Sequence, residues 1–174
     1  MLDLDIKKFS LTDSTDTIKS LYGGKTRIRV CGICLQNESI LLIKHEGIGV
    51  TGELWVPPGG GIEYGEPAEK ALKREFREEC NVEIKVKKLL FINEFIQKPL
   101  HAIELFFEVQ LLSGKIKKGM DPEFNKEHQI INEVRFVTFN ELNLLPDNKK
   151  HGILRGEISS EILLNMFGYF KLSQ

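Results

Sequence analysis

The chain has 174 residues and carries 24 basic against 25 acidic side chains, a formal net charge of −1. This length predicts one domain with a core large enough to fold without disulfides or a structural metal. The balanced charge speaks against a protein whose main partner is nucleic acid. No apolar run approaches the length of a membrane span. We therefore expect neither nucleic acid nor a membrane as a partner.

The three cysteines and the first residues of the chain indicate the cellular compartment in which the protein works. Cys31 and Cys34 have C-x-x-C spacing, but they lie in an apolar alternation and no second Cys or His pair follows. We therefore interpret them as buried strand residues rather than a zinc or redox site. A low, odd cysteine count suits a reducing compartment. The N-terminus has no basic or long apolar segment of a secretory signal. A cytoplasmic protein is expected.

Periodicity and turn residues predict the elements in chain order. Residues 1–25 predict an N-terminal arm or short helix, followed by a single domain over 26–174. Strands are expected at 26–35, 39–44, 54–56, 82–97, 102–112 and 130–138. Loops are expected at 45–53, 59–61 and 113–128. Helices are expected at 67–80, at 140–145 and at the C-terminus, where Ile158, Ile162, Met166 and Tyr169 are spaced three or four residues apart. Strands interleaved with helices predict a mixed sheet between helices.

The helix predicted from Ala68 to Cys80 has acidic residues where it should pack. At about 100° per residue, its apolar and basic residues occupy opposite sides. Glu75 and Glu79 fall within the apolar arc and Glu78 borders it. Like charges one turn apart repel, and more strongly when desolvated, so this cluster predicts a cationic partner. Oxygen ligands without His or Cys favour Mg²⁺, with Mn²⁺ as a substitute. The alternative is a surface helix with i, i+4 pairs such as Arg74–Glu78.

The helix is preceded by Pro57-Pro58 and then by Gly59-Gly60-Gly61. Glycine lets the backbone approach a ligand closely, and a carbonyl oxygen in such a loop can ligate a metal. A glycine triplet alone is also typical of a plain turn. Beside the inward-facing glutamates, it predicts the wall of a site.

The segment from Gly60 to Val82 resembles the Nudix box, G-x5-E-x7-R-E-U-x-E-E-x-G-U, where U is apolar. The charged positions all agree, and the matching residues are Gly60, Glu66, Arg74, Glu75, Glu78, Glu79 and Val82. One residue departs from the pattern, because Asn81 stands where the box has Gly. Asn tolerates a left-handed C′ position next best after Gly, so we expect catalysis to be unaffected and Asn81→Gly to raise stability.

This resemblance to the Nudix hydrolase family, and to its MutT-like members, implies a fold and a chemistry. The implied fold is an α/β/α sandwich with a mixed β-sheet. The implied reaction is Mg²⁺- or Mn²⁺-dependent hydrolysis of a phosphoanhydride bond in a nucleoside diphosphate linked to another group. Such substrates include a nucleoside triphosphate, ADP-ribose or a nucleotide sugar. Many relatives dimerise, so the resemblance also allows a homodimer.

The resemblance also implies roles for individual residues. Metal ligands would be Glu75, Glu78, Glu79 and a carbonyl oxygen of Gly59 or Gly60. Glu75 would double as general base, Arg74 would orient a glutamate, and Glu66 would brace the loop against the helix. The segment Lys126-Glu127-His128-Gln129 resembles the Lys-Glu-Gly-Gln segment of MutT-type enzymes. Glu127 is therefore a further candidate for metal binding or for water activation.

Residues that select the substrate are harder to identify from sequence. Tyr64 and Phe124 lie in predicted loops and are candidate contacts to a base. Aromatic residues in the predicted strands, such as Phe91 and Phe106, are more typical of core positions. Pro99 lies close to where ADP-ribose hydrolases carry a proline, although a loop proline is the simpler interpretation.

Two other functions compete with the hydrolase. One is a non-catalytic Nudix-like sensor or binding module for ADP-ribose or nucleotides. The other is isopentenyl diphosphate isomerase, whose characteristic cysteine and glutamate setting we do not find. A binding module is expected to lose glutamates of the box, and this chain keeps them all. The hydrolase is therefore the favoured interpretation.

Overall fold

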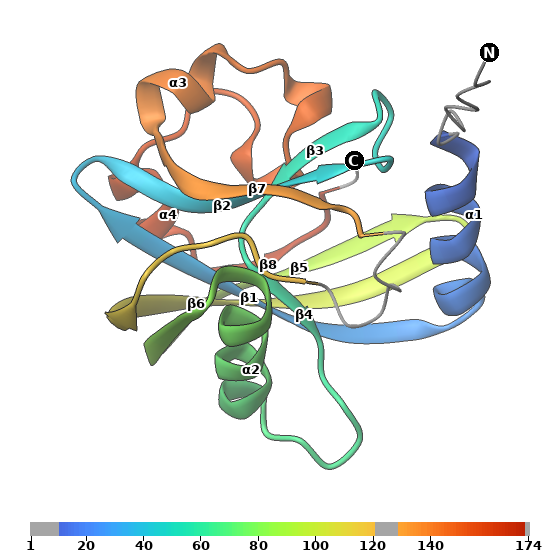
Figure 1. Cartoon of the computed structure of the whole chain (residues 1–174), viewed down its shortest axis with the longest axis horizontal. Helices are drawn as coiled ribbons and strands as arrows, with labels where there is room; N and C mark the ends of the chain where they lie inside the picture. Colours follow the sequence, from blue (N-terminus) through green and yellow to red (C-terminus); the bar gives the residue numbers. More distant parts are fainter. Residues whose placement is uncertain (1–10, 121–128, 173–174) are drawn as a thin grey trace, which may run out of the picture.

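The computed structural model describes residues 11–120 and 129–172 (Figure 1). The helical elements are α1 (Leu11–Tyr22), α2 (Ala68–Cys80), α3 (Phe139–Leu144), η1 (Asp147–Lys149), η2 (Gly152–Leu154) and α4 (Ser160–Asn165). The strands are β1 (Thr26–Gln36), β2 (Ser39–Glu46), β3 (Glu53–Val56), β4 (Gly59–Gly61), β5 (Val82–Gln97), β6 (Leu100–Gly114), β7 (Ile131–Thr138) and β8 (Gly168–Phe170). Within these described ranges, no helix combines the length and apolarity needed to cross a membrane.

The strands form one mixed sheet in the order β3-β2-β1-β6-β5-β8, with β4 paired to β1 and β7 paired to β2. Strand β1 runs parallel to β6 from Thr26 to Cys34, but it pairs with β2 only at Leu35 and Gln36. The group β2–β3–β7 is therefore joined to the group β1–β6–β5 at one end only. In Figure 1 the two groups diverge from this junction toward α1.

Helices cover both faces of the sheet, which confirms the predicted α/β/α sandwich. On one face, α2 packs against β2 through Leu72, Phe76, Leu41 and Ile43. On the other face, α3, η2 and α4 pack against β1, β5 and β6 around Phe106. Successive residues of a strand point to opposite faces, so β1 and β2 supply side chains to both apolar clusters.

Helix α2 forms where the sequence predicts it. Pro67, with φ −65°, precedes the first helical residue, and the acidic Glu69 lies in the first turn, where it suits the positive end of the helix. Asn81 ends the helix in the left-handed conformation, with φ 59°. Glu75 and Glu79 are buried together with the apolar residues of the helix, as the angular positions predicted.

Two predicted elements differ from the structure. The C-terminal helix is wrong beyond Asn165: the chain extends at Met166, turns at Gly168 (φ 91°), and Gly168–Phe170 pairs with β5 as strand β8. The open edge of β5 offers backbone partners there, and Phe170 packs edge-on against Phe91 at 5.6 Å. The predicted loop at 59–61 is also a strand, because β1 pairs with it.

The conformation of Asn81 leads to a stability prediction. Its side chain donates a hydrogen bond to the carbonyl oxygen of Lys115 at 3.2 Å. Replacement by Gly removes the left-handed strain but also this bond. The gain in stability that the sequence alone predicts for Asn81→Gly is therefore offset, and we expect the free energy of unfolding to change by less than about 0.5 kcal/mol. Asn81→Ala loses the bond and keeps the strain, so it should cost about 1–2 kcal/mol. Urea unfolding measures both, and equal stability of the Ala variant would contradict this account.

Candidate active site

A cavity of about 620 Å³ lies where the two groups of strands diverge. Its wall includes α1, the β2–β3 connection, β4 and the β5–β6 hairpin. Helix α1 contributes Ile18 and Tyr22, and the guanidinium of Arg27 lies 3.4 Å from the centre of the Tyr22 ring. The charged residues of the lining include Glu75 and Glu79 of α2. The acidic face of the predicted helix therefore borders this cavity.

Backbone glycines hold the two buried glutamates in place. Glu75 is 7% exposed and Glu79 is 4% exposed. The backbone N–H of Gly59 donates to Glu79 Oε2 at 2.8 Å. A Cβ atom on Gly60 would lie only 2.4 Å from Glu75 Oε1, so only glycine lets the strand approach this carboxylate. The glycine-rich segment thus forms part of the cavity wall beside both carboxylates.

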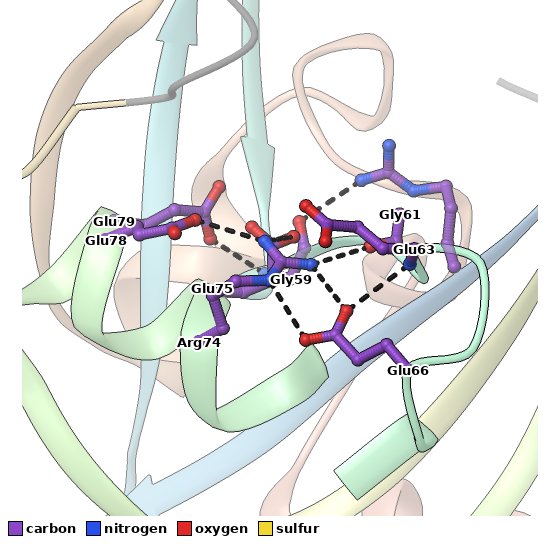
Figure 2. A network of polar contacts seen from close by, with 9 residues as sticks. Gly59, Gly61, Glu63, Glu66, Arg74, Glu75, Glu78 and Glu79 are labelled. Carbon is purple, nitrogen blue, oxygen red and sulfur yellow. Dashed lines mark hydrogen bonds and ion pairs between the residues drawn. The ribbon is translucent and has the colours of Figure 1, made fainter. Parts of the chain in front are cut away.

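Arg74 connects the acidic residues to the glycine segment (Figure 2). Its Nη1 donates to Glu75 Oε1 at 2.8 Å and to Glu78 Oε2 at 3.1 Å. Its Nε and Nη2 donate to both oxygens of Glu66, and Nη2 also donates to the carbonyl oxygen of Gly61 at 3.0 Å. One guanidinium therefore offsets the repulsion among three carboxylates and fixes the loop to the helix.

Glu66 also stabilises the turn that precedes α2. Its Oε2 accepts the backbone N–H of Glu63 at 3.3 Å. The hydrogen bonds from Arg74 are the largest cause of a lowered pKa for the Glu66 carboxyl. The carboxylate is therefore held charged between loop and helix, which is the bracing position that the resemblance implied for it.

The pKa of Glu75 moves in the opposite direction. Burial raises the pKa of this carboxyl to about 7, although Arg74 and Arg29 lower it. A buried carboxyl with a pKa near neutrality can take up and release a proton under ordinary conditions. The charge of Glu75 therefore depends on what binds beside it.

The donor set fits a hard divalent cation. Glu75, Glu78 and Glu79 supply carboxylate oxygens from one helix, and Gly59 and Gly60 lie beside Glu79 and Glu75. Among the residues the structure describes, no three acidic, His or Cys side chains already converge on one metal position. Arg74 and the Gly59 N–H hold these carboxylates instead. Mg²⁺ keeps several waters and needs only one or two carboxylates plus substrate phosphates, so a preformed cage is not required.

Glu78 differs from the other two glutamates. Its side chain is 31% exposed and does not line the cavity, whereas Glu75 and Glu79 do. The backbone carbonyls of Glu78 and Glu79 accept hydrogen bonds from Met120 and Gly119. In Figure 2 Arg74 joins the Glu78 side chain to the rest of the polar network.

The structure places the residues that the sequence suggested as substrate contacts in different surroundings. Tyr64 is fully exposed on the turn before α2 and lies outside the cavity lining. Phe124 and Glu127 lie outside the described residues. Pro99 does line the cavity, at the β5–β6 hairpin.

A buried polar network under the cavity escaped the sequence reasoning. Glu104 Oε2 accepts from Asn93 Nδ2 at 2.8 Å and lies 3.2 Å from His151 Nε2. Arg29 lies 3.8 Å from Glu104 Oε1 and donates to the carbonyl oxygen of Gly59 at 3.3 Å. Burial raises the pKa of Glu104, but His151, Arg29 and Asn93 outweigh it and lower this pKa to about 2. The network ties the floor of the cavity to the glycine segment.

One signal could have revealed this network. Glu104 interrupts an otherwise apolar row of β6 between Ala102 and Phe106, and Arg29 precedes Cys31 and Ile33 in a similar row of β1. A charged residue on the buried face of a strand predicts a paired charge or a site. The pairing itself joins residues far apart in the chain.

Comparison with known proteins places the chain among hydrolases. A family model described as the NUDIX domain matches residues 25–155. An ADP-ribose pyrophosphatase of Methanocaldococcus jannaschii is 30% identical over 122 residues, covering 69% of this chain and 71% of that protein. Nucleoside triphosphatase NudI of an Enterobacter species is 33% identical over 131 residues, covering 72% of this chain and 91% of that protein. A NUDIX hydrolase structure from Nitrosomonas europaea shares the fold, with a TM-score of 0.62 at 18% identity, covering 85% of this chain and 79% of that one.

The contact between Gly60 and Glu75 gives a test of the site. In Gly60→Ala the new methyl group would displace the Glu75 carboxylate, so we expect metal affinity to fall at least about tenfold. Gly61→Ala is the matched control, because its methyl group would meet only the movable tip of Arg27, at 3.0 Å. Calorimetric titration with Mn²⁺ compares the two variants. Equal affinities would show that Glu75 is not held by this contact.

The raised pKa of Glu75 predicts a pH dependence of metal binding. The carboxyl must lose its proton to bind a cation, so protons compete with the metal below its pKa of about 7. The apparent affinity for Mn²⁺ should therefore fall by up to about tenfold for each pH unit below 7 and level off above it. Titrations over this range in wild type and in the exposed-site control Glu69→Gln measure the effect. A fall confined to about pH 4–5, the ordinary carboxyl range, would contradict it.

Proposed function

Because the chain belongs to the Nudix hydrolase family, we propose that it cleaves a phosphoanhydride bond in a nucleoside diphosphate derivative with the help of Mg²⁺ or Mn²⁺. The substrate is a nucleoside triphosphate, ADP-ribose or a nucleotide sugar. The observation that carries the proposal is the pair of buried carboxylates, Glu75 and Glu79, set against a glycine strand on the wall of a cavity large enough for a nucleotide.

The two relatives support the assignment of the bond that is cleaved rather than the identity of the substrate. One is named an ADP-ribose pyrophosphatase and the other a nucleoside triphosphatase. These two substrates differ in what the phosphates carry, but both contain a nucleoside joined to a phosphoanhydride. The shared chemical feature is therefore the bond that the proposal assigns.

Each residue of the acidic cluster takes a role in this reaction. Glu75, Glu78, Glu79 and the carbonyl oxygen of Gly60 would hold the metal, with Glu127 as a further ligand or base. When bound, the metal neutralises phosphate charge and lowers the pKa of water. Glu75 accepts the proton of the attacking water, a task that its pKa of about 7 suits.

The remaining residues position these groups. Arg74 orients Glu75 and Glu78 through Nη1, and Glu66 fixes Arg74 from the other side. Arg29 lies on the cavity wall, where its guanidinium can meet a phosphate oxygen as well as the Gly59 carbonyl. A negatively charged substrate thus finds cationic groups on the chain in addition to the metal.

A substrate panel tests the proposal. Nucleoside triphosphates, ADP-ribose, nucleotide sugars and dinucleoside polyphosphates are incubated with the protein and Mg²⁺, and released phosphate or nucleotide is quantified. We expect turnover of at least one member and its loss on chelation of the metal. Metal binding without any turnover would favour a nucleotide-binding module instead.

Substitution of one buried glutamate tests the assigned residues. Glu79→Gln keeps the side-chain size and one oxygen near the Gly59 N–H but removes the charge. We expect turnover to fall at least about a hundredfold, because several kcal/mol of charge stabilisation is lost. Glu69→Gln, an exposed position on the same helix, is the control. With both variants folded by circular dichroism, a loss below about tenfold would remove Glu79 from the metal site.

A further inference from the structure

His45 breaks the pattern of the strand that carries it. Residues at alternate positions of β2 share a face, and on one face Leu41 and Ile43 are fully buried. His45 comes next on this face and is only 8% exposed. An apolar residue would continue the row. A polar ring therefore occupies a core-like position at the point where the strand reaches the cavity.

The imidazole of His45 has a polar atom that nothing in the described residues satisfies. Its Nε2 is buried and has no hydrogen-bond partner among residues 11–120 and 129–172. His45 lines the same cavity as Glu75 and Glu79. Leaving a buried polar atom unpaired is costly, so such atoms in native proteins usually meet water or a ligand. The cavity is where that partner can lie.

The neighbours of His45 are apolar. Leu54 pairs with it across β3, and Ile131 pairs with it across β7. Directly opposed residues of antiparallel strands present their side chains to the same face. Ile48 and Ile130 line the cavity as well. The result is an apolar recess with one hydrogen-bonding ring at its base.

The recess connects to the catalytic groups through Arg29. Burial, and then the charge of Arg29, lower the pKa of His45 to about 3, so the ring is neutral. A neutral imidazole offers one donor and one acceptor. The same Arg29 donates to Gly59, whose N–H holds Glu79. Arg29, Glu79 and His45 line one cavity, so a ligand with a phosphate at Arg29 can place its remaining part at His45.

We propose that His45 binds the polar edge of the nucleobase of the substrate and thereby selects which base the enzyme accepts. A nucleobase presents apolar faces and a polar edge of donors and acceptors, which matches an apolar recess with a neutral ring. A ribose presents hydroxyl groups on several sides and fits such a recess poorly, and phosphate is better served by Arg29. The inference rests on the proposed function for the identity of the ligand.

Binding of nucleoside monophosphates tests this role separately from hydrolysis. AMP, GMP, CMP and UMP differ only in the base and contain no phosphoanhydride bond. Calorimetric titration should show that the wild-type protein prefers one base over the least favoured by at least about tenfold. In His45→Leu the preference should shrink to within about threefold, because a site without the hydrogen-bonding group no longer rejects the wrong base. His45→Gln places an amide near the position of Nε2 and should recover part of the base preference.

Lys44→Leu is the matched control. Lys44 is the preceding residue of β2 and its side chain lies toward Glu53 at 3.5 Å, on the opposite face from His45. The base preference of the Lys44→Leu variant should equal that of the wild-type protein. Thermal unfolding checks that all variants fold, and we expect no loss for His45→Leu because Nε2 has no described partner to lose.

Three outcomes would overturn the proposal: no binding of any monophosphate, no base preference in wild type, or an undiminished preference in His45→Leu. These outcomes are distinct from a failure of the proposed function. Hydrolysis of the panel without base preference would leave the hydrolase standing and remove the role of His45. A base preference that depends on His45, without hydrolysis of any compound, would keep the role of His45 and remove the hydrolase function.

Discussion

The guanidinium of Arg74 is the interaction on which the site depends. It bonds to Glu66, Glu75, Glu78 and the carbonyl oxygen of Gly61 at once. Without this charge, the carboxylates of Glu66, Glu75 and Glu78 would repel one another and the glycine segment would lose its anchor on the helix. A planar group with five donors can satisfy such a set, whereas a lysine could not. The cluster is therefore held together by groups of the chain itself.

The backbone of β4 is the second constraint. Pairing with β1 fixes Gly59–Gly61 beside the helix, and the absence of a Cβ on Gly60 lets Glu75 come within reach. The Gly59 N–H then orients Glu79. Loop, strand and helix thus share one network, so a change in the glycine segment reaches the carboxylates directly. This is why a single added methyl group is expected to act on metal binding.

The cavity exists because β1 pairs with β6 along most of its length but with β2 only at one end. Because β2 pairs with only two residues of β1, the two groups of strands separate and leave space between them. Helix α1, which precedes the region that matches the family model, forms part of the wall. Arg29 and His45 lie within the matched region, as do the acidic helix and the glycine strand, and all of these elements line the same cavity.

The sequence by itself determined the helix of the site and the chemistry of its acidic face. Spacing within 23 residues places Glu75 and Glu79 among apolar neighbours and Arg74 within reach of Glu78, because a helix repeats locally. Only the tertiary structure decided the contacts between distant strands. Glu104 meets His151 and Arg29 through sheet pairing, and the C-terminal segment became β8 because the edge of β5 offered backbone partners. Tyr64 faces solvent for the same reason: the position of a turn relative to a cavity depends on packing that local spacing does not encode.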